Sequence, residues 1–244
     1  MDSVYIVMPA YNEEENIEIV VKEWYPFVER NGSDSRLVIA DSGSLDQTHN
    51  ILLKLQQIFP QLEVLSNTGK QHGPKVIALY RYAIGQGADF IFQTDSDGQT
   101  NSAELDEFWR MRDSYDAILG YRKKREDGAS RAFVEKVVCF LLKIYFRVDV
   151  PDANAPFRLM RSNLVKKYLS NMPADYNLPN IMLTTYFAYC NENITFRTVS
   201  FKPRQRGVNS INIPKIVKIG WKALKDFRMF KKEMKKLYGT QKDS

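Results

Sequence analysis

Cysteine and histidine are scarce in this chain of 244 residues, which contains two of each. Cys139 and Cys190 show no spacing that suggests a metal site. Two histidines argue against a His-based metal site or catalytic triad, and we expect His72 to be a loop residue. So few cysteines fit a reducing, cytosolic compartment.

Long apolar runs are also missing. A membrane-spanning helix needs roughly 18–20 apolar residues in succession. The nearest segment, residues 132–150, is interrupted by Glu135, Lys136, Lys143 and Arg147. The N-terminus leads directly into an apolar strand pattern, so no targeting peptide is visible. We therefore expect a cytoplasmic protein, and the 44% apolar content is sufficient for a substantial core.

Positive charge is concentrated near the C-terminus. Residues 213–238 hold nine Lys/Arg and two acidic residues, a net +7 against +6 for the whole chain. The rest of the chain is therefore close to neutral. The basic character belongs to a tail, and we expect no nucleic-acid-binding surface on the fold.

The same basic segment has helical periodicity. Apolar residues recur at steps of three and four with lysines between them, which is typical of an amphipathic helix in the headgroup region of an anionic membrane. The alternative is a helix that packs on the protein's own core. We expect residues 213–244 to form a tail distinct from a domain of residues 1–212. The apolar positions are Ile213, Ile216, Val217, Gly220, Trp221, Leu224, Phe227, Phe230, Met234 and Leu237.

Strand and helix patterns alternate along the first half of the chain. This alternation predicts an α/β fold with right-handed crossovers and a mostly parallel sheet between helices. The first strand is expected to stop at Pro9, and the first helix is expected to be capped by Asn12. Strands are predicted at residues 4–8, 37–40, 62–65, 90–93 and 116–120.

The second half of the chain is expected to complete the same domain, because no linker separates the halves. A polar, charged loop at residues 121–131 precedes a strongly apolar helical segment. Further elements are predicted at residues 132–146 (helix), 155–160 (strand), 181–189 (helix) and 194–201 (strand).

Three predicted strands end in polar residues that suit one ligand. Asp95 and Asp97 follow the fourth strand and offer hard oxygen ligands to Mg²⁺ or Mn²⁺, which in turn holds a diphosphate. Tyr11 could stack on a base, Asp41 could accept hydrogen bonds from a base or ribose, and Lys75 could meet phosphate charge. Each residue alone has a simpler structural explanation. Together, at the carboxyl ends of parallel strands, they favour a nucleotide-diphosphate site.

Three segments, MPAYNEE (8–14), DSGSLDQT (41–48) and DSDGQ (95–99), resemble the signatures of the inverting family-two glycosyltransferases of GT-A fold. Two more, DANAPFR (152–158) and RQRGVNS (204–210), resemble elements of the dolichyl- or polyprenyl-phosphate sugar synthases, the group within that family to which the likeness is closest. The likeness covers about residues 3–212.

The resemblance implies that a nucleotide pocket and a metal site lie together. Two departures matter: Ser42 stands where the family usually has a second aspartate, and residues 154–156 differ from its Thr-Ser-Gly. The nucleotide therefore stays open between UDP, GDP and dTDP, and the acceptor side is expected to be reshaped. The candidate nucleotide-sugar residues are Pro9, Ala10, Tyr11, Glu13, Asp41, Lys75, Asp95 and Ser96, and the candidate metal ligands are Asp95, Asp97 and Gln99.

The acceptor decides which further groups are needed. A lipid phosphate is already ionised near neutral pH, so it needs cations rather than a base. Arg122, Arg131 and Arg204 match the arginines that such synthases place around this phosphate, and the planar guanidinium suits a bidentate grip. A sugar hydroxyl would instead need a carboxylate base, for which Asp152 is the candidate. Asp97 is also expected to be catalytic, through the metal.

These features predict an inverting, metal-dependent glycosyltransferase. It would move a sugar from a nucleotide diphosphate to a polyprenyl phosphate or lipid-linked glycan, as a peripheral protein at the cytoplasmic membrane face. The alternatives are transfer to a polysaccharide hydroxyl and a non-catalytic, membrane-bound nucleotide-sugar-binding subunit. A sugar-1-phosphate nucleotidyltransferase would need a Gly-rich loop with Arg and Lys, which residues 9–13 lack. The sequence does not decide whether the chain forms a homo-oligomer or binds a membrane-protein partner.

Overall fold

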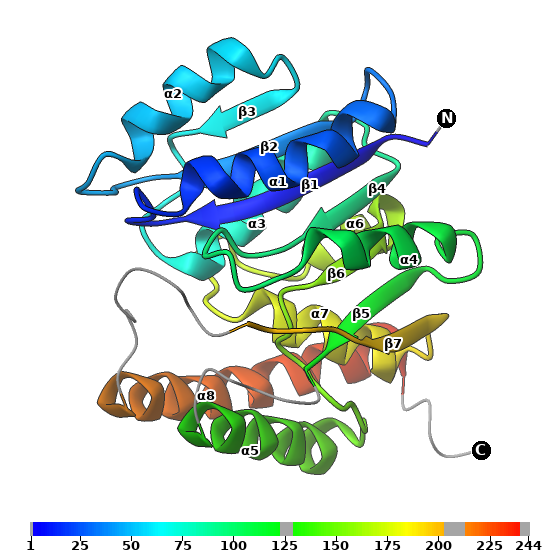
Figure 1. The fold of residues 1–244 in the computed structure, drawn as a ribbon. Coiled ribbons are helices and arrows are strands. Elements are labelled where there is room, and N and C mark those ends of the chain that lie inside the picture. The colour runs from blue at the N-terminus through cyan, green and yellow to red at the C-terminus, as the bar shows by residue number, and fades with distance from the viewer. Residues whose placement is uncertain (1, 123–128, 203–212, 240–244) are drawn as a thin grey trace.

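The computed structural model describes residues 2–122, 129–202 and 213–239, without the side chains of residues 129–133 and 213–224. Within these ranges the chain forms a seven-stranded sheet of order β3-β2-β1-β4-β6-β5-β7 (Figure 1). The sheet is parallel except for β6, which runs antiparallel to both neighbours. The strands are β1 (Val4–Ala10), β2 (Arg36–Asp41), β3 (Leu62–Leu65), β4 (Phe90–Gln93), β5 (Ala117–Tyr121), β6 (Arg158–Arg161) and β7 (Ile194–Thr198).

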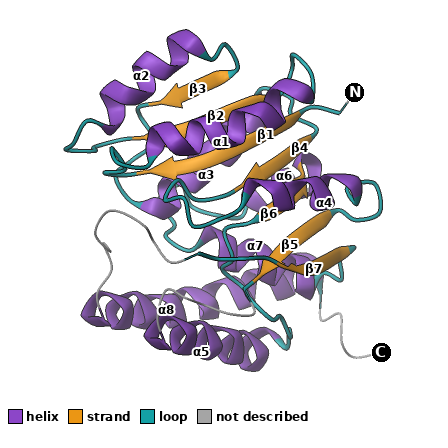
Figure 2. Cartoon of the chain, viewed as in Figure 1, coloured by secondary structure: helices purple, strands orange, loops and turns teal. Residues whose placement is uncertain are grey.

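Helices cover both faces of the sheet, so the α/β prediction is confirmed (Figure 2). Within the described ranges, none of them combines the length and apolar character needed to cross a bilayer. One face carries α1 (Ile17–Arg30), α2 (Thr48–Ile58), η1 (Ser102–Glu104) and α4 (Leu105–Arg110). The other carries α3 (His72–Gly85), α5 (Ala129–Phe146), α6 (Ser162–Leu169), α7 (Pro179–Tyr189) and α8 (Ile213–Tyr238).

The central strands are apolar on both sides because both sides are covered. In β1, Val4, Ile6 and Met8 belong to the core under α1, whereas Tyr5 and Val7 belong to the core under α3. All five side chains are buried. Two-sided burial explains why β1 reads as an unbroken apolar run rather than an alternating one.

Pro9 does not end the first strand, contrary to the prediction. β1 continues to Ala10, and Pro9 pairs with Ala40 of β2. The ladder between β1 and β4 ends earlier, at Val7 opposite Gln93. Proline is tolerated because β1 has a ladder partner on only one side at this point, which lowers the demand for a backbone donor.

Gly73 lies where the start of α3 touches the loop before α7. A Cβ at this position would overlap the carbonyl oxygen of Tyr176 and lie 2.6 Å from the carbonyl carbon of Asn177. Because both obstacles are backbone atoms, Gly73→Ala is expected to lower the free energy of unfolding by about 1–3 kcal/mol. Gly85, at the end of the same helix, has open space around its Cβ position.

Gly85→Ala is therefore the matched control. Alanine favours the helix over glycine, so this variant should be neutral or stabilised by up to about 1 kcal/mol. Denaturant unfolding of both variants measures the difference. Equal stability of the two variants would contradict the close approach at Gly73.

Candidate active site

The ends of β1, β2 and β4 meet at one edge of the sheet. Ala10 pairs with Asp41, so β1 and β2 end side by side. Just beyond β4, Ser96 Oγ donates a hydrogen bond to the Pro9 carbonyl at 2.9 Å. The structure thus brings together the three polar strand ends that the sequence singled out, at the edge where parallel α/β sheets bind ligands.

Asn12 holds two of the loops at this edge together. Its φ is +56°, a left-handed conformation that asparagine tolerates. Its Oδ1 accepts from the Leu45 N–H at 2.8 Å, and its own N–H donates to Ser44 Oγ at 3.0 Å. The expectation that Asn12 caps the first helix is wrong, because α1 begins at Ile17 and Asn12 braces the 44–48 loop instead.

Glu13 is buried beside this brace. Its N–H donates to Thr48 Oγ1 at 2.8 Å, and its carboxylate accepts from Asn16 Nδ2 at 2.8 Å. Tyr11, two residues earlier, is 39% exposed, and Lys75 Nζ lies 5.3 Å from its ring centroid. The two predicted site residues therefore differ: Glu13 supports the loop from within, and Tyr11 offers a surface.

Asp41 and Lys75 form the floor between β1 and β2. Asp41 is buried and accepts a hydrogen bond from Ser44 Oγ, and its Oδ2 lies 3.2 Å from His49 Nδ1. Lys75 is only 1% exposed and donates to the Ala10 carbonyl. Burial lowers the pKa of the Lys75 ammonium, and the Asp41 carboxylate acts in the opposite direction. Lys75 is therefore part of the site floor, not a solvated side chain.

The predicted metal ligands follow β4 directly. Asp95 is partly exposed, and its Oδ1 lies 3.3 Å from His72 Nε2, so His72 borders the site. Asp97 Oδ1 accepts from the Gln99 N–H at 3.1 Å. Among the described residues no three His, Cys, Asp or Glu side chains form a metal-binding cluster. Two carboxylates fit a hard divalent cation that takes its remaining ligands from water and a substrate diphosphate.

Gln99 connects this motif to a distant segment. The side-chain Nε2 of Gln99 donates to the backbone carbonyl of Lys202 at 2.8 Å, and the backbone carbonyl of Gln99 accepts from the Lys202 N–H at 2.8 Å. The side chain is buried. The Asp95–Gln99 turn is thus fastened to the chain after β7, a pairing that local sequence patterns did not predict.

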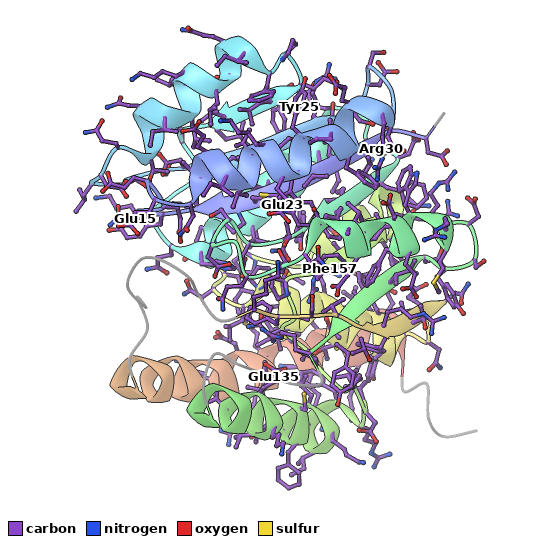
Figure 3. All side chains as sticks on the ribbon, viewed as in Figure 1. Glu15, Glu23, Tyr25, Arg30, Glu135 and Phe157 are labelled. Carbon is purple, nitrogen blue, oxygen red and sulfur yellow. The ribbon has the colours of Figure 1, made fainter. Side chains whose placement is uncertain are left out.

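Arg122 and Asp152 form a buried ion pair. Arg122 Nε and Nη2 donate to Asp152 Oδ2 and Oδ1 at 2.7 and 2.9 Å, and both residues are at least 92% buried. Glu135, which projects from α5 (Figure 3), lies 3.8 Å from Arg122 and accepts from the Ala153 N–H at 2.8 Å. Burial raises the pKa of Glu135, the Asp152 carboxylate raises it further, and Arg122 acts against both.

Arg158 is a buried residue of this region that sequence reasoning did not select for a role. Its guanidinium donates to the carbonyls of Ala155 (2.8 Å) and Asn180 (3.1 Å) and to Ala153 (3.4 Å). It therefore fastens the 152–157 loop, which carries Asp152, to the start of α7. The one sequence signal for Arg158 was its place in the segment 152–158. Its burial could not be predicted, because local periodicity does not show that an arginine is buried.

Two predicted arginines cannot be placed. Arg204 lies outside the described residues, and the backbone of Arg131 belongs to α5 while its side chain lies outside the description. Their roles stay predictions.

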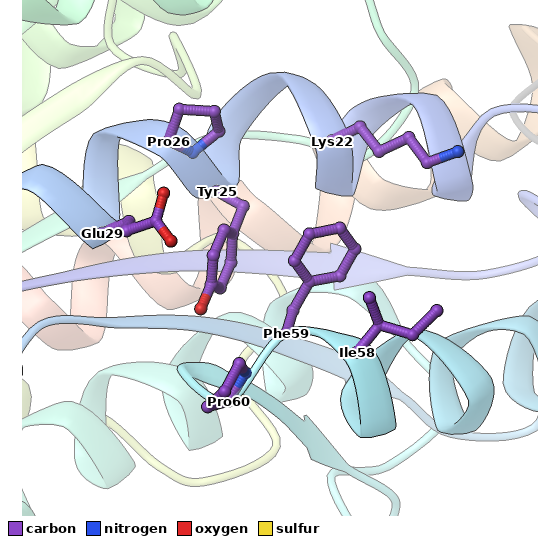
Figure 4. Close-up of a pocket in the computed structure, with 7 residues that line it drawn as sticks. All are labelled: Lys22, Tyr25, Pro26, Glu29, Ile58, Phe59 and Pro60. Carbon is purple, nitrogen blue, oxygen red and sulfur yellow. The ribbon is translucent and has the colours of Figure 1, made fainter.

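A surface pocket between α1 and α2 lies away from this edge (Figure 4). It is formed where α1 ends and where the chain enters β3, at the opposite edge of the sheet. It is not part of the candidate site. Its lining residues are Lys22, Tyr25, Pro26, Glu29, Ile58, Phe59 and Pro60.

Comparison with known proteins agrees with this geometry. The family described as "Glycosyl transferase family 2" matches residues 5–169. The undecaprenyl-phosphate 4-deoxy-4-formamido-L-arabinose transferase of Shewanella sediminis is 28% identical over 174 residues, covering 69% of this chain and 51% of that protein. The protein of the same name from Pectobacterium carotovorum is 22% identical over 170 residues, with 68% and 51% covered. The chain thus spans about half the length of these relatives.

Solved structures share the fold. Glucosyl-3-phosphoglycerate synthase from Mycobacterium tuberculosis, in complex with Mn²⁺, UDP and phosphoglyceric acid, has a TM-score of 0.67 at 17% identity, covering 94% of this chain and 78% of that chain. TarS 1–349 of S. aureus with UDP-GlcNAc has a TM-score of 0.56 at 18% identity, covering 86% and 62%. The predicted GT-A fold is confirmed.

Proposed function

Because the chain belongs to glycosyl transferase family 2, we propose that it is an inverting glycosyltransferase. It transfers the sugar of a nucleotide-diphosphate sugar to a polyprenyl phosphate or a polyprenyl-linked acceptor at the cytoplasmic face of a membrane. The observation that carries this proposal is the meeting of three strand ends, which places Tyr11, Asp41 and the two aspartates after β4 at one edge. The named relatives use undecaprenyl phosphate, which supports the acceptor class.

On the donor side, the chain's own residues orient the nucleotide. Tyr11 offers an open ring for a base, Asp41 offers buried carboxylate oxygens, and Lys75 supplies a positive charge beneath them. Asp95 and Asp97 would hold a Mg²⁺ or Mn²⁺ ion. The chemistry that such an ion supplies when bound is neutralisation of the charge that develops on the departing diphosphate.

On the acceptor side, the buried ion pair favours a phosphate over a hydroxyl. A general base must accept a proton, but both Asp152 oxygens accept hydrogen bonds from Arg122. A cationic partner at this distance stabilises the ionised carboxylate and makes it a weaker base. An ionised lipid phosphate needs no base, so it can attack the anomeric carbon from the face opposite the leaving group and invert it.

Thermal shift with a panel of UDP-, GDP- and dTDP-sugars tests the donor side. One nucleotide sugar should raise the melting temperature more with Mn²⁺ than with chelator, because ligands that bind only the folded state stabilise it by mass action. The same sugar should then appear in the lipid extract after incubation with undecaprenyl phosphate. If no nucleotide sugar stabilises the protein with metal, the proposed function is wrong.

A further inference from the structure

Three of the four predicted apolar positions of α8 whose side chains are described are covered by the protein's own core, and the fourth, Leu237, is 56% exposed. Phe227, Phe230 and Met234 are at most 1% exposed. The ring centroids of Phe227 and Phe146, which lies on α5, are 5.6 Å apart, and those of Phe230 and Tyr176 are 5.0 Å apart. These three buried side chains cannot insert into a bilayer, so a lipid contact has to involve another surface.

α5 has two different sides. Glu135, Leu142 and Phe146 face inward, and Glu135 reaches the loop that carries Asp152. A second set lies about 180° around the helix from these residues. It consists of Val137, Phe140 and Ile144, which are 38%, 61% and 56% exposed. We call these three residues the outer stripe of α5. Three large apolar side chains in a row on one exposed helix face differ from scattered surface residues.

The helix next to α5 carries basic side chains. α5 and α8 pack side by side along one margin of the molecule (Figure 1). The side of α8 that faces away from its buried residues is exposed and contains no acidic residue among the described positions. We call this set the basic face of α8: Lys225, Arg228, Lys232, Lys235 and Lys236.

We propose that the outer stripe of α5 and the basic face of α8 together form the surface that docks on an anionic lipid bilayer. This inference rests on the proposed lipid-linked acceptor. Apolar side chains enter the interfacial region, while lysine and arginine meet anionic headgroups, and each acts more strongly with the other present. Charge complementarity selects the occupant, because a second copy of this face would bring two basic rows together.

The position of the stripe also suits transfer to a lipid. α5 presents Glu135 to the Arg122–Asp152 pair on its inner side and the stripe to solvent on its outer side. A bilayer on the outer side would lie one helix diameter, about 10–12 Å, from the acceptor side of the site. A phosphate on a membrane-embedded chain could then reach the site without the lipid leaving the bilayer.

Vesicle flotation of the full chain tests the surface. The parent should float with phosphatidylcholine vesicles that contain phosphatidylglycerol, not with phosphatidylcholine alone, and less in high salt. Phe140→Asp/Ile144→Asp should weaken binding at least tenfold. Lys232→Glu/Lys235→Glu/Lys236→Glu should do the same, since each basic residue near such a surface contributes about fivefold.

The matched control is Ile19→Asp/Ile58→Asp. These isoleucines are exposed to a similar extent, 57% and 67%, but lie on α1 and α2. The control should float like the parent, and circular dichroism should show all variants folded. Failure of the parent to bind anionic vesicles, or equal binding by the α5 variant and the control, would overturn the inference. So would a dimer in light scattering that the α5 variant abolishes while vesicle binding persists.

Nucleotide binding separates this result from the proposed function. The α5 and α8 variants should keep the parent's donor-induced thermal shift, because the substituted residues are not at the strand-end site. A normal thermal shift with no vesicle binding would reject the docking surface alone. No thermal shift in the parent would reject the function, whatever the vesicles show.

Discussion

Replacing Asp97 with alanine is expected to lower sugar transfer by about a thousandfold or more while the chain stays folded. Two carboxylates follow β4, and loss of one leaves a divalent cation with too few protein ligands. A metal is worth several kcal/mol of charge stabilisation in such a reaction, and about 1.4 kcal/mol corresponds to tenfold in rate. Transfer to undecaprenyl phosphate, from the nucleotide sugar that stabilises the parent most, measures the loss.

Asp113→Ala is the control for this experiment, because Asp113 is a highly exposed aspartate in the turn after α4, with its side chain 71% exposed. It should transfer at the parent's rate. The metal-dependent part of the donor-induced thermal shift should also disappear in Asp97→Ala and in Asp95→Ala. An Asp97→Ala protein that keeps the parent's rate and its metal-dependent thermal shift would remove the basis for the donor side of the mechanism.

The fold was predictable because its signals are local. β1 and β4 are short runs buried on both sides, and their polar ends come directly after them in the chain. Strand, turn and helix each leave a pattern within about ten residues, and right-handed crossovers then order the central strands. α6 was missed, although Leu164, Val165, Tyr168 and Leu169 repeat at helical steps. Its eight residues follow β6 without a turn, and two lysines obscure the stripe.

The site was predictable only in its outline. Tyr11, Asp41 and the Asp95–Asp97 pair were placed correctly at one edge because parallel strands share their carboxyl ends. The contacts of Gln99 with Lys202 join positions 103 residues apart, which no local pattern encodes. The same holds for His49 beside Asp41, because the spacing of eight residues crosses a loop whose path depends on Asn12.

The sequence could not decide what covers the apolar side of α8, for a related reason. A 3.6-residue repeat gives a helix an apolar side but does not say what covers it. Whether Phe230 meets lipid or Tyr176 depends on how α5, α7 and α8 pack, which is decided by tertiary contacts. The division of the chain at residue 213 stays a prediction, and the buried residues of α8 join its described part to the core under α3.

The Arg122–Asp152 pair carries the second large prediction. Arg122→Ala should lower the free energy of unfolding by about 3–5 kcal/mol, because it leaves a buried carboxylate without its cation. Arg30→Ala is the matched control: Arg30 pairs with Asp106 at the surface, where both side chains are about half exposed. An exposed pair contributes at most about 1 kcal/mol. Urea unfolding at neutral pH measures both.

The loss in Arg122→Ala should also depend on pH. Burial and the Asp152 carboxylate raise the folded-state pKa of Glu135, and Arg122 opposes them, so removing Arg122 raises that pKa further above the unfolded value of about 4.3. A raised folded-state pKa stabilises the protein below the unfolded pKa, and that stability is lost as pH rises through the folded-state value. The gap between parent and variant should therefore widen from pH 4 toward pH 7.

A double-mutant cycle decides whether the two residues act as a pair. Asp152→Ala alone removes the carboxylate that accepts hydrogen bonds from Arg122 Nε and Nη2 and leaves Glu135 3.8 Å from the guanidinium, so this variant should also be strongly destabilised. The double variant removes both charges of the pair. Its loss of unfolding free energy should therefore be clearly less than the sum of the losses in the single variants. Additive losses that do not change with pH would mean that Arg122 and Asp152 are held by packing alone. The weak-base argument that favours a phosphate acceptor would then lose its support.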